Sequence, residues 1–439
     1  MTEASISIIT LDEDRALAPA VVGAKAATLA RAKQAGLPVL DGFAIPVTAA
    51  LETLSTGARA LKKGNSGLAR SQITSSPIDP TLAKEIEAKA AGLGEQLVVR
   101  SSAQVEAGGA WAGAFTSYAE LAPGEVVLGI KGCWASVFSP EVLARAEAAR
   151  MQPADLGMAV LVQREISADF GGVANVSESG TVTVIATPGP PAAIVSGWER
   201  GHVAIVDQDG VQSGGARAEI GHSRLEAVAG LARATALRIN CHHIEWAEVE
   251  GTLWLLQAQT LAPRHATQPV PIEWGNESSE PQASVEELTQ LVDKEVAGRD
   301  QCRRQGMTRW EPALFRIVSS RGERWTGDSA APGWGAGRIR LIRDADDAAY
   351  FRPREVVAAM YPLNNLAPLL WEAAGVVTVG GSPGAHLFEV AAWLGLPAVC
   401  GVDIEAATGL SLDRLRASHA FLGAVDGDGG GLSVLRTEG

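Results

Sequence analysis

The chain has few cysteines, no block of basic residues and no long apolar run, and each shortage excludes a class of protein. The four cysteines (133, 241, 302 and 400) stand far apart and form no CxxC pair. A zinc site or a disulfide framework is therefore not expected, and buried or incidental free thiols in a reducing compartment are the simpler interpretation.

Charge and hydropathy argue against nucleic acid and membranes as partners. The net charge is −13 and no segment concentrates Lys and Arg, so neither nucleic acid nor an anionic membrane surface is an expected partner. No stretch of 18 or more apolar residues occurs, and the acidic start, residues 1–15, does not resemble a signal peptide. We therefore expect a cytoplasmic protein without a membrane partner.

The sequence does contain enough apolar residues for a large core. Of the 439 residues, 46% are hydrophobic and 20% are charged, which favours a folded, multidomain chain. Helical and strand patterns alternate over residues 20–264, and residues 265–284 are rich in Pro, Ser and Glu. We predict an α/β domain at 1–264, a linker with one helix at 265–309, and a smaller α/β domain at 310–439.

Several elements can be predicted inside these domains. In the first domain we expect a helix at 24–35 ended by Gly36, strands at 96–100, 158–164 and 203–206, and a hairpin of strands 243–248 and 252–259. In the linker we expect a helix at 285–304, and in the second domain strands at 337–342, 355–360, 376–379 and 398–402, with a helix at 387–394.

Two basic side chains of the first domain stand where an anion could bind. Lys25 lies in the first turn of the expected helix, where backbone N–H groups and the helix dipole favour an anion. Arg100 ends an apolar strand and needs a partner there, for which a phosphate is one option. The alternatives are a solvated surface residue for Lys25 and a carboxylate salt bridge for Arg100.

A small-residue loop and a hairpin are two further candidate features. Residues 107–113 would let the backbone approach a ligand closely, although such clusters are often plain turns. Glu245 and Gln257 share one face of the hairpin as diagonal neighbours, roughly 7–8 Å apart between backbones. Two oxygen ligands so placed suit a magnesium ion that holds a triphosphate, and an exposed polar hairpin face is the alternative.

One of the seven histidines occupies a special position. His386 follows a strand and a glycine-rich loop, residues 380–385, and begins the expected helix at 387–394. The positive partial charge of a helix N-terminus keeps an imidazole neutral and nucleophilic, and it favours a phosphoryl group on the ring. A histidine that merely caps a helix is the alternative.

The motifs of the first domain occur in the order of a known family. Lys25 and the segments 99–103 (VRSSA), 111–113 (WAG), 133–138, 158–164, 194–197, 244–247 (IEWA) and 255–258 (LLQA) resemble the ATP-grasp domain of phosphoenolpyruvate synthase, pyruvate phosphate dikinase and rifampicin phosphotransferase. The resemblance implies that ATP and Mg²⁺ bind here. The residues it implies are Lys25 and Arg100 for phosphates, Gly113 and Ser117 above them, Gln163 at the adenine edge, and Glu245 and Gln257 for the metal.

The second domain resembles the swivelling phosphohistidine domain of the same enzymes. The matching segments are 331–333 (APG) with Gly335 and Gly337, 375–378 (GVVT), His386, and 394–399 (LGLPAV) with Gly401. The resemblance implies that His386 is the catalytic phosphoryl carrier.

The chain departs from the family at several positions. Gln259 stands where relatives have arginine, His243 where they have aspartate, and Gly384 and Ala385 where a hydroxyl or thiol residue precedes the histidine; Glu106 keeps one carboxylate of a shortened loop. No pyruvate-binding barrel and no rifampicin-binding insertion is apparent, so neither compound is an expected substrate.

The function that the resemblance implies is an ATP-dependent phosphotransferase. ATP would be split to AMP and phosphate through a phosphohistidine, and the phosphoryl group would pass to a small-molecule acceptor or to a substrate held by a partner protein. Two alternatives stay open: a non-catalytic or altered relative that binds nucleotide, and a phosphohistidine carrier subunit that serves a partner protein.

Overall fold

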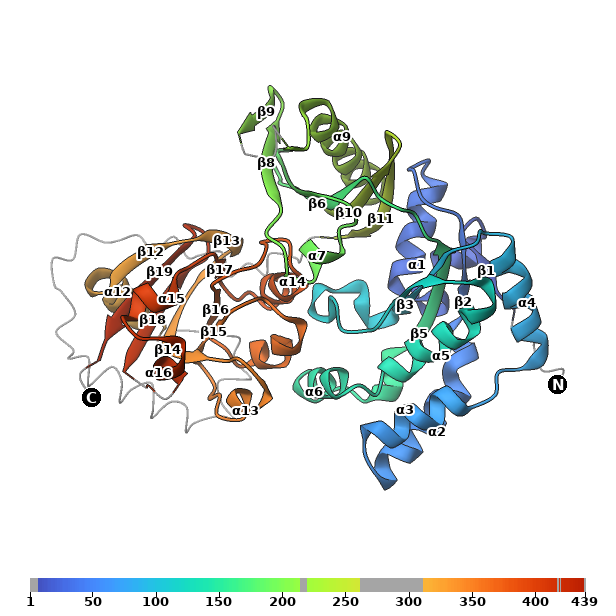
Figure 1. Ribbon diagram of the computed structural model, residues 1–439, viewed down its shortest axis with the longest axis horizontal. Coiled ribbons are helices and arrows are strands. Elements are labelled where there is room, and N and C mark those ends of the chain that lie inside the picture. The colour runs from blue at the N-terminus through green and yellow to red at the C-terminus, as the bar shows by residue number, and fades with distance from the viewer. Residues whose placement is uncertain (1–6, 214–218, 261–310, 417, 419, 438–439) are drawn as a thin grey trace. The chain divides into compact units, whose positions relative to one another are not determined.

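The computed structural model describes residues 7–213, 219–260, 311–416, 418 and 420–437 (Figure 1). Contacts divide the described residues into two compact units, those of Met1–Ile194 with Gly201–Leu261, and those of Val195–Arg200 with Ala262–Gly439. Both units mix helices with sheets, as the sequence predicts. The predicted linker at 265–309 and its helix at 285–304 lie outside the described residues.

Two antiparallel sheets form the frame of the first unit, in the orders β1-β2-β5-β3-β4 and β11-β10-β6-β7-β8-β9. Their strands are β1 (Ile9–Thr10), β2 (Gly42–Ile45), β3 (Leu97–Ala103), β4 (Tyr118–Leu121), β5 (Met158–Arg164), β6 (Phe170–Val176), β7 (Val182–Pro188), β8 (His202–Asp207), β9 (Gly210–Ser213), β10 (His243–Val249) and β11 (Thr252–Gln259). A backbone bond from Leu255 N–H to Pro38 O, 2.8 Å long, joins β11 to the segment that leads into β2.

The helices of the first unit are α1 (Pro19–Gln34), α2 (Val47–Lys63), α3 (Ser66–Ser75), α4 (Pro80–Ala91), α5 (Val126–Ser136), α6 (Pro140–Ala148) and α9 (His222–Ile239), and α7 (Ala192–Val195) lies at the division between the units. Short 3₁₀ segments are η1 (Asp14–Leu17), η2 (Gln104–Ala107), η3 (Gly109–Trp111), η4 (Pro123–Glu125) and η5 (Pro153–Leu156). Helix α1 contacts β3 and β5 of one sheet and β11 of the other. Its apolar side shares a buried core with α9, so α1 is held between the two sheets.

The second unit is built on one eight-stranded sheet of order β12-β19-β18-β14-β15-β16-β17-β13. Strands β14 to β17 run parallel and the outer pairs are antiparallel. The strands are β12 (Glu323–Thr326), β13 (Asp328–Ala331), β14 (Trp334–Leu341), β15 (Val356–Ala359), β16 (Gly375–Thr378), β17 (Ala398–Cys400), β18 (Phe421–Asp426) and β19 (Gly431–Arg436). The helices are α12 (Glu311–Arg321), α13 (Ala345–Ala348), η6 (Asn364–Trp371), α14 (His386–Trp393), α15 (Ile404–Thr408) and α16 (Leu412–Arg416).

Two sequence predictions need correction in their bounds. The strand expected at 96–100 continues to Ala103, so Arg100 lies in the middle of β3 and does not end it. The helix expected at 24–35 is the second part of α1, which begins at Pro19 and is interrupted at Gly23. The predicted strands at 158–164, 376–379 and 398–402 and the helix at 387–394 correspond to β5, β16, β17 and α14.

The helical run Pro123–Ala148 is unusually apolar. Pro123–Ala148 is long and apolar enough to cross a membrane on length and composition, but 56% of its most apolar window is buried inside the protein. Core helices pass the same test, and α5 within this run packs on β3 and β5.

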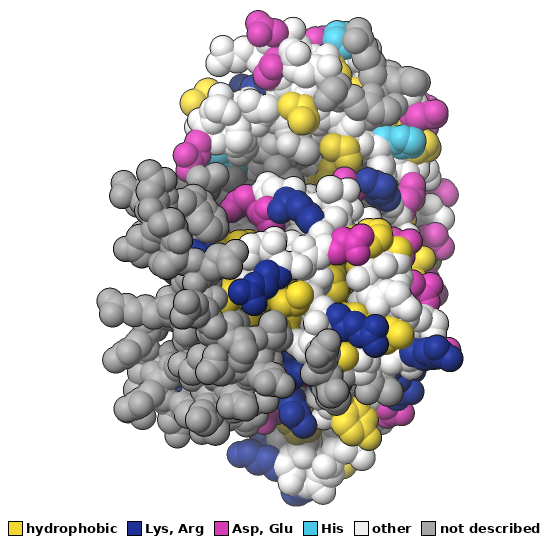
Figure 2. Space-filling view, turned by 90° about the vertical axis from the view of Figure 1, so that its left-hand side faces the viewer, with side chains coloured by type: hydrophobic (Ala, Val, Ile, Leu, Met, Phe, Trp, Pro, Cys, Tyr) yellow, Lys and Arg dark blue, Asp and Glu magenta, His cyan; other side chains and the backbone are white. Residues whose placement is uncertain are grey.

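On the face drawn in Figure 2, basic, acidic and apolar side chains are interspersed.

Candidate functional site

The position of Lys25 is fixed by a glycine and a serine. Gly23 has φ +74°, and a Cβ there would lie 1.7 Å from the carbonyl oxygen of Ser102, so only glycine allows α1 to approach β3 so closely. The Ser102 hydroxyl donates to Val22 O at 2.8 Å and accepts the Ala26 N–H at 3.1 Å. This hydroxyl therefore caps the helical segment that begins with Ala24 and attaches Lys25 to the strand that carries Arg100.

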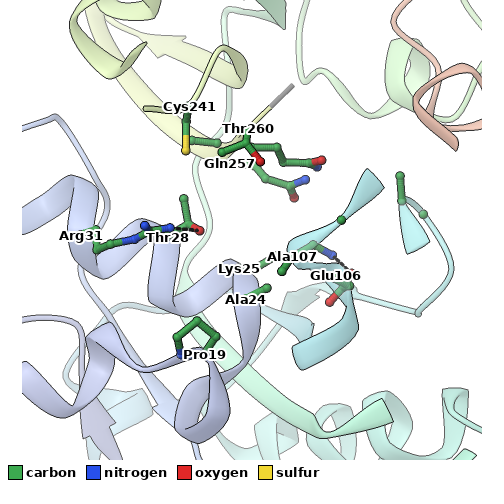
Figure 3. Close-up of a pocket in the computed structure, with 15 residues that line it drawn as sticks. Pro19, Ala24, Lys25, Thr28, Arg31, Glu106, Ala107, Cys241, Gln257 and Thr260 are labelled. Atoms are coloured by element: carbon green, nitrogen blue, oxygen red, sulfur yellow. Dashed lines mark hydrogen bonds and ion pairs between the residues drawn. The ribbon is translucent and has the colours of Figure 1, made fainter. Parts of the chain in front are cut away.

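Lys25 faces a pocket inside the first unit. Its ammonium lies 2.6 Å from the buried carboxylate of Glu106, which also accepts the Ala103 N–H at 2.7 Å. The pocket is lined on one side by α1 and the loop at 107–113, including Gly113, and on the other by the end of β11, including Gln257 and Gln259 (Figure 3). Lys25 is thus a pocket residue and not the solvated surface lysine of the alternative interpretation.

Arg100, Glu245 and Gln257 form a second polar group next to this pocket. The Arg100 guanidinium donates to Leu256 O at 2.6 Å and to the Gln257 Oε1 at 3.2 Å, and it lies 3.9 Å from the Glu245 carboxylate. The carboxylate expected as one partner of Arg100 is therefore near it, and its binding of a phosphate stays a prediction.

The expected geometry of the hairpin was wrong in one respect. A bulge between Glu245 and Trp246 shifts the register, so Glu245 and Gln257 are directly opposed and not diagonal. Their exposed fractions are 5% and 4%, which excludes the exposed hairpin face. The turn has φ +49° at Glu250 and φ +78° at Gly251, as a two-residue hairpin turn of mirror-image type requires.

The two opposed side chains fit a hard cation such as Mg²⁺. The Glu245 Oε1 is buried and has no hydrogen-bond partner among the described residues, which leaves an oxygen available for a ligand. Among the described residues no group of three or more His, Cys, Asp or Glu side chains is placed to hold a metal ion by itself. A carboxylate, an amide oxygen and phosphate oxygens are the set from which Mg²⁺ is usually held at nucleotide sites.

The small-residue loop at 107–113 is anchored by a buried arginine that the sequence analysis did not single out. Arg145 of α6 is fully buried and donates to Ala110 O at 3.4 Å and to Ala112 O at 2.9 Å, while Glu141 pairs with it at 2.8 Å. Burial lowers the pKa of Arg145, and the Glu141 charge opposes that shift. A lone arginine in a helix carries no signal in sequence that it will bind a loop 33 residues earlier.

The other predicted residues of the first unit lie apart from the pocket. Ser117 is exposed just before β4, and Gln163 is buried on β5, where its amide donates to Leu40 O at 2.9 Å. Neither is a lining residue of the pocket around Lys25. His243 is opposite Gln259 in the hairpin, and its Nδ1 lies 2.6 Å from the Asn175 Oδ1.

Sequence reasoning missed several lining residues of the pocket, namely Thr28, Arg31, Cys241 and Thr260. Thr28 and Arg31 follow Lys25 along α1, and their spacing from Lys25 was the available signal. Cys241 was interpreted as an incidental buried thiol, and it is indeed buried, but it also lines the pocket. Burial raises the pKa of the Cys241 thiol, and the nearby Arg31 charge opposes this.

His386 begins α14 in the second unit, after the buried Ala385 as N-cap. Its Nδ1 lies 3.5 Å from a carboxylate oxygen of Glu389, one turn further along the helix. The hydroxyl of the loop before it belongs to Ser382, which is buried and accepts the Gly384 N–H at 3.1 Å. Gly384 and Ala385 themselves offer no hydroxyl, so Ser382 is the hydroxyl-bearing residue of the loop at 380–385.

Comparisons with known proteins match most of the first unit to a nucleotide-binding family. Residues 19–275 match the family described as pyruvate phosphate dikinase, AMP/ATP-binding domain. A "Probable phosphoenolpyruvate synthase" of Archaeoglobus fulgidus is 24% identical over 70% of the chain and 40% of its own length. Another with the same description, from Staphylothermus marinus, is 23% identical over 90% of the chain and 54% of its own length.

A third relative has a different description. The "Prodigiosin synthesizing transferase PigC" of Serratia marcescens is 29% identical over 61% of the chain and 34% of its own length. The chain therefore spans less than two thirds of the length of each of these relatives. The family match covers more than half of the chain and includes Lys25, Arg100, Glu245 and Gln257, so the chain belongs to the pyruvate phosphate dikinase AMP/ATP-binding domain family.

Proposed function

We propose that this chain is an ATP-dependent phosphotransferase in which the first unit, an ATP-grasp-type domain, binds ATP and His386 carries the phosphoryl group to an acceptor. The observation that carries the proposal is that Lys25 and Gln257 line one pocket, and that Arg100 contacts Gln257 beside it, within the family's nucleotide-binding domain. A pocket lysine, and an arginine next to a carboxylate with an unpartnered oxygen, suit a metal-bound polyphosphate.

In this proposal each side chain has a separate role. Lys25 and Arg100 bind phosphate oxygens and offset the charge that develops on them. Glu245 and Gln257 hold Mg²⁺, which neutralises the charge of the triphosphate when it is bound. The loop at 107–113, anchored by Arg145, offers backbone N–H groups to the phosphates without steric hindrance from side chains.

His386 is the proposed nucleophile of the second unit, which we assign to the swivelling phosphohistidine fold. Because the Glu389 carboxylate faces Nδ1, a dianionic phosphoryl group is disfavoured on that atom, and Nε2 is the acceptor. The Nε2 lone pair attacks the β-phosphorus of ATP, the bond between the β-phosphorus and the oxygen of AMP breaks, and AMP leaves. Water then cleaves the bridge between the two phosphoryl groups and phosphate leaves. The bond from phosphorus to Nε2 breaks last, as an oxygen of the acceptor takes the remaining phosphoryl group.

The proposed reaction requires motion between two parts of the chain. The nucleotide residues and His386 belong to different compact units, and in this proposal the phosphoryl carrier moves between the nucleotide and the acceptor. The Pro- and Ser-rich segment at 265–284 is the proposed hinge. We predict that limited proteolysis cuts first in this segment and releases two folded pieces; initial cleavage elsewhere would argue against the hinge.

Quantifying AMP and ADP after incubation with ATP and Mg²⁺ tests the proposal. A dikinase-type enzyme produces AMP and phosphate, stoichiometric with His386 when no acceptor is present and catalytic when one is added. ADP as the sole product would overturn the pyrophosphoryl step. Unchanged ATP, bound but not cleaved, would favour a nucleotide-binding relative that lacks turnover, for which the neutral Gln259 at the pocket is the motivating observation.

A further inference from the structure

The helix that carries Lys25 also brings a second cation to the same pocket. Arg31 lies six residues after Lys25 on α1 and lines the pocket with Thr28, Gln257 and Thr260. Figure 3 shows its side chain directed along the pocket wall toward Thr28. The guanidinium is held there by a hydrogen bond of 3.2 Å to the Thr28 hydroxyl.

Arg31 differs from Lys25 and Arg100 in that no carboxylate among the described residues pairs with it. The Lys25 ammonium is offset by the Glu106 carboxylate at 2.6 Å. The Arg100 guanidinium is engaged by Leu256 O and Gln257, with Glu245 at 3.9 Å. Arg31 is exposed, and among the described residues it forms no ion pair with a carboxylate.

The charge of Arg31 acts on the pocket wall and not only on solvent. Cys241, on the opposite side of the pocket, is a buried thiol whose pKa is raised by burial, and Arg31 is the charged group that opposes this shift. The neighbouring Gln259 and Thr260 contribute no charge of their own.

We propose that Arg31 is a phosphate-binding residue of the nucleotide site, which contacts the polyphosphate of ATP through its guanidinium. This inference rests on the proposed function. A planar guanidinium can give two parallel N–H bonds to a phosphate, which lysine cannot, and its contact with Thr28 limits the orientations it adopts. Thr28 is accordingly a positioning residue.

The chain offers a matched control for this residue. Arg59 of α2 is also exposed, and its guanidinium donates to the hydroxyl of Thr56, three residues earlier, at 2.8 Å. It repeats the Arg–Thr contact of Arg31 and Thr28, but it lies outside the pocket lining. Arg31→Ala and Arg59→Ala therefore remove the same side chain and the same local contact from a helix surface, and only the first removes a pocket cation.

The experiment measures dissociation constants of ATP, ADP and AMP with excess Mg²⁺ by titration calorimetry. We expect Arg31→Ala to weaken ATP binding about 10- to 100-fold, ADP binding less, and AMP binding within about twofold, as loss of charge-assisted phosphate bonds predicts. Arg31→Lys should recover part of the affinity, and Arg59→Ala should match the wild type. Thermal unfolding without nucleotide should be the same for both alanine variants.

The outcomes separate the inference from the function on which it rests. If the wild type itself binds no ATP, the proposed function fails. If the wild type binds ATP but Arg31→Ala binds it as tightly as Arg59→Ala does, the inference about Arg31 is overturned and the function stands. An equal loss for ATP and AMP would also overturn it, because the side chain would then act away from the polyphosphate.

Discussion

The ammonium of Lys25 and the carboxylate of Glu106 lie 2.6 Å apart and join helix α1 to the segment that follows strand β3. Glu106 is buried and is also bound by the Ala103 N–H, so its position is set by the backbone and Lys25 adapts to it. Lys25 is therefore held at the wall of the pocket before any ligand arrives, which reduces the entropy that binding a phosphate would cost.

The first prediction concerns stabilisation by ATP. We expect ATP with Mg²⁺ to raise the melting temperature, since at 100-fold excess over the dissociation constant linkage gives about 2.7 kcal/mol. Lys25→Ala should remove most of this shift. Lys33→Ala is the matched control, because Lys33 lies on the same helix but pairs with Asp12 and Asp41, at 2.8 and 2.7 Å.

Differential scanning fluorimetry over a series of ATP concentrations measures both variants. Equal ATP-induced shifts in Lys25→Ala and Lys33→Ala would show that Lys25 does not bind the nucleotide. No shift in the wild type would contradict nucleotide binding itself.

The second prediction concerns the metal. Glu245→Gln should raise the Mg²⁺ concentration needed for ATP binding about 10-fold, because an amide oxygen replaces a carboxylate. Glu248→Gln, on the same strand, should leave the Mg²⁺ dependence unchanged. It should instead lower the free energy of unfolding by about 1–2 kcal/mol, because Glu248 forms a two-bond pair with Arg224 at 2.7 and 2.8 Å. Identical Mg²⁺ dependence in both variants would argue against Glu245 as a ligand.

The third prediction concerns the cysteines. Burial raises the pKa of the thiols of Cys241 and Cys400, that of Cys400 to about 12. A raised thiol pKa means less thiolate at neutral pH, so alkylation should be slow near pH 7 and should accelerate as pH rises toward the raised values. ATP should protect Cys241, which lines the pocket, and should leave Cys400 of the second unit unaffected. Peptide mass mapping measures both rates; equal effects of ATP on both thiols would count against a ligand at the Cys241 wall.

Much of the fold could be predicted because its elements carry local signals. The run from Met158 to Arg164 is apolar and bounded by turns, and it forms β5 with the predicted bounds. The two-residue turn at Glu250 and Gly251 set the hairpin. The edge strand β12 and its neighbour β19 were not predicted, since short strands that pair across more than 100 residues leave little local pattern.

The identity of site residues could be predicted where they belong to a sequence motif. Their positions could not be predicted where contacts between distant elements set them. Lys25 and Arg100 could be named, but their connection through Gly23 and Ser102 depends on a close approach between α1 and β3. The bulge at Glu245 changed which residues oppose each other, and no residue type marks it in the sequence. Arg31 was missed because its spacing from Lys25 on α1 is a weak signal, and an exposed helix arginine is ordinary whether or not a pocket lies beside it.

The most direct test of the account is the transfer of label from β-³²P-ATP to the wild-type protein without an acceptor. We predict an acid-labile, alkali-stable phosphoryl group that maps to His386, since a phosphorus–nitrogen bond to imidazole hydrolyses once the ring is protonated. His386→Ala should abolish the label while ATP-induced stabilisation persists, and His222→Ala should keep it, because His222 pairs with Glu226 at 3.2 Å in the first unit, outside the residues that line the pocket. Absence of label on the wild type, or equal labelling of His386→Ala, would contradict the phosphohistidine mechanism.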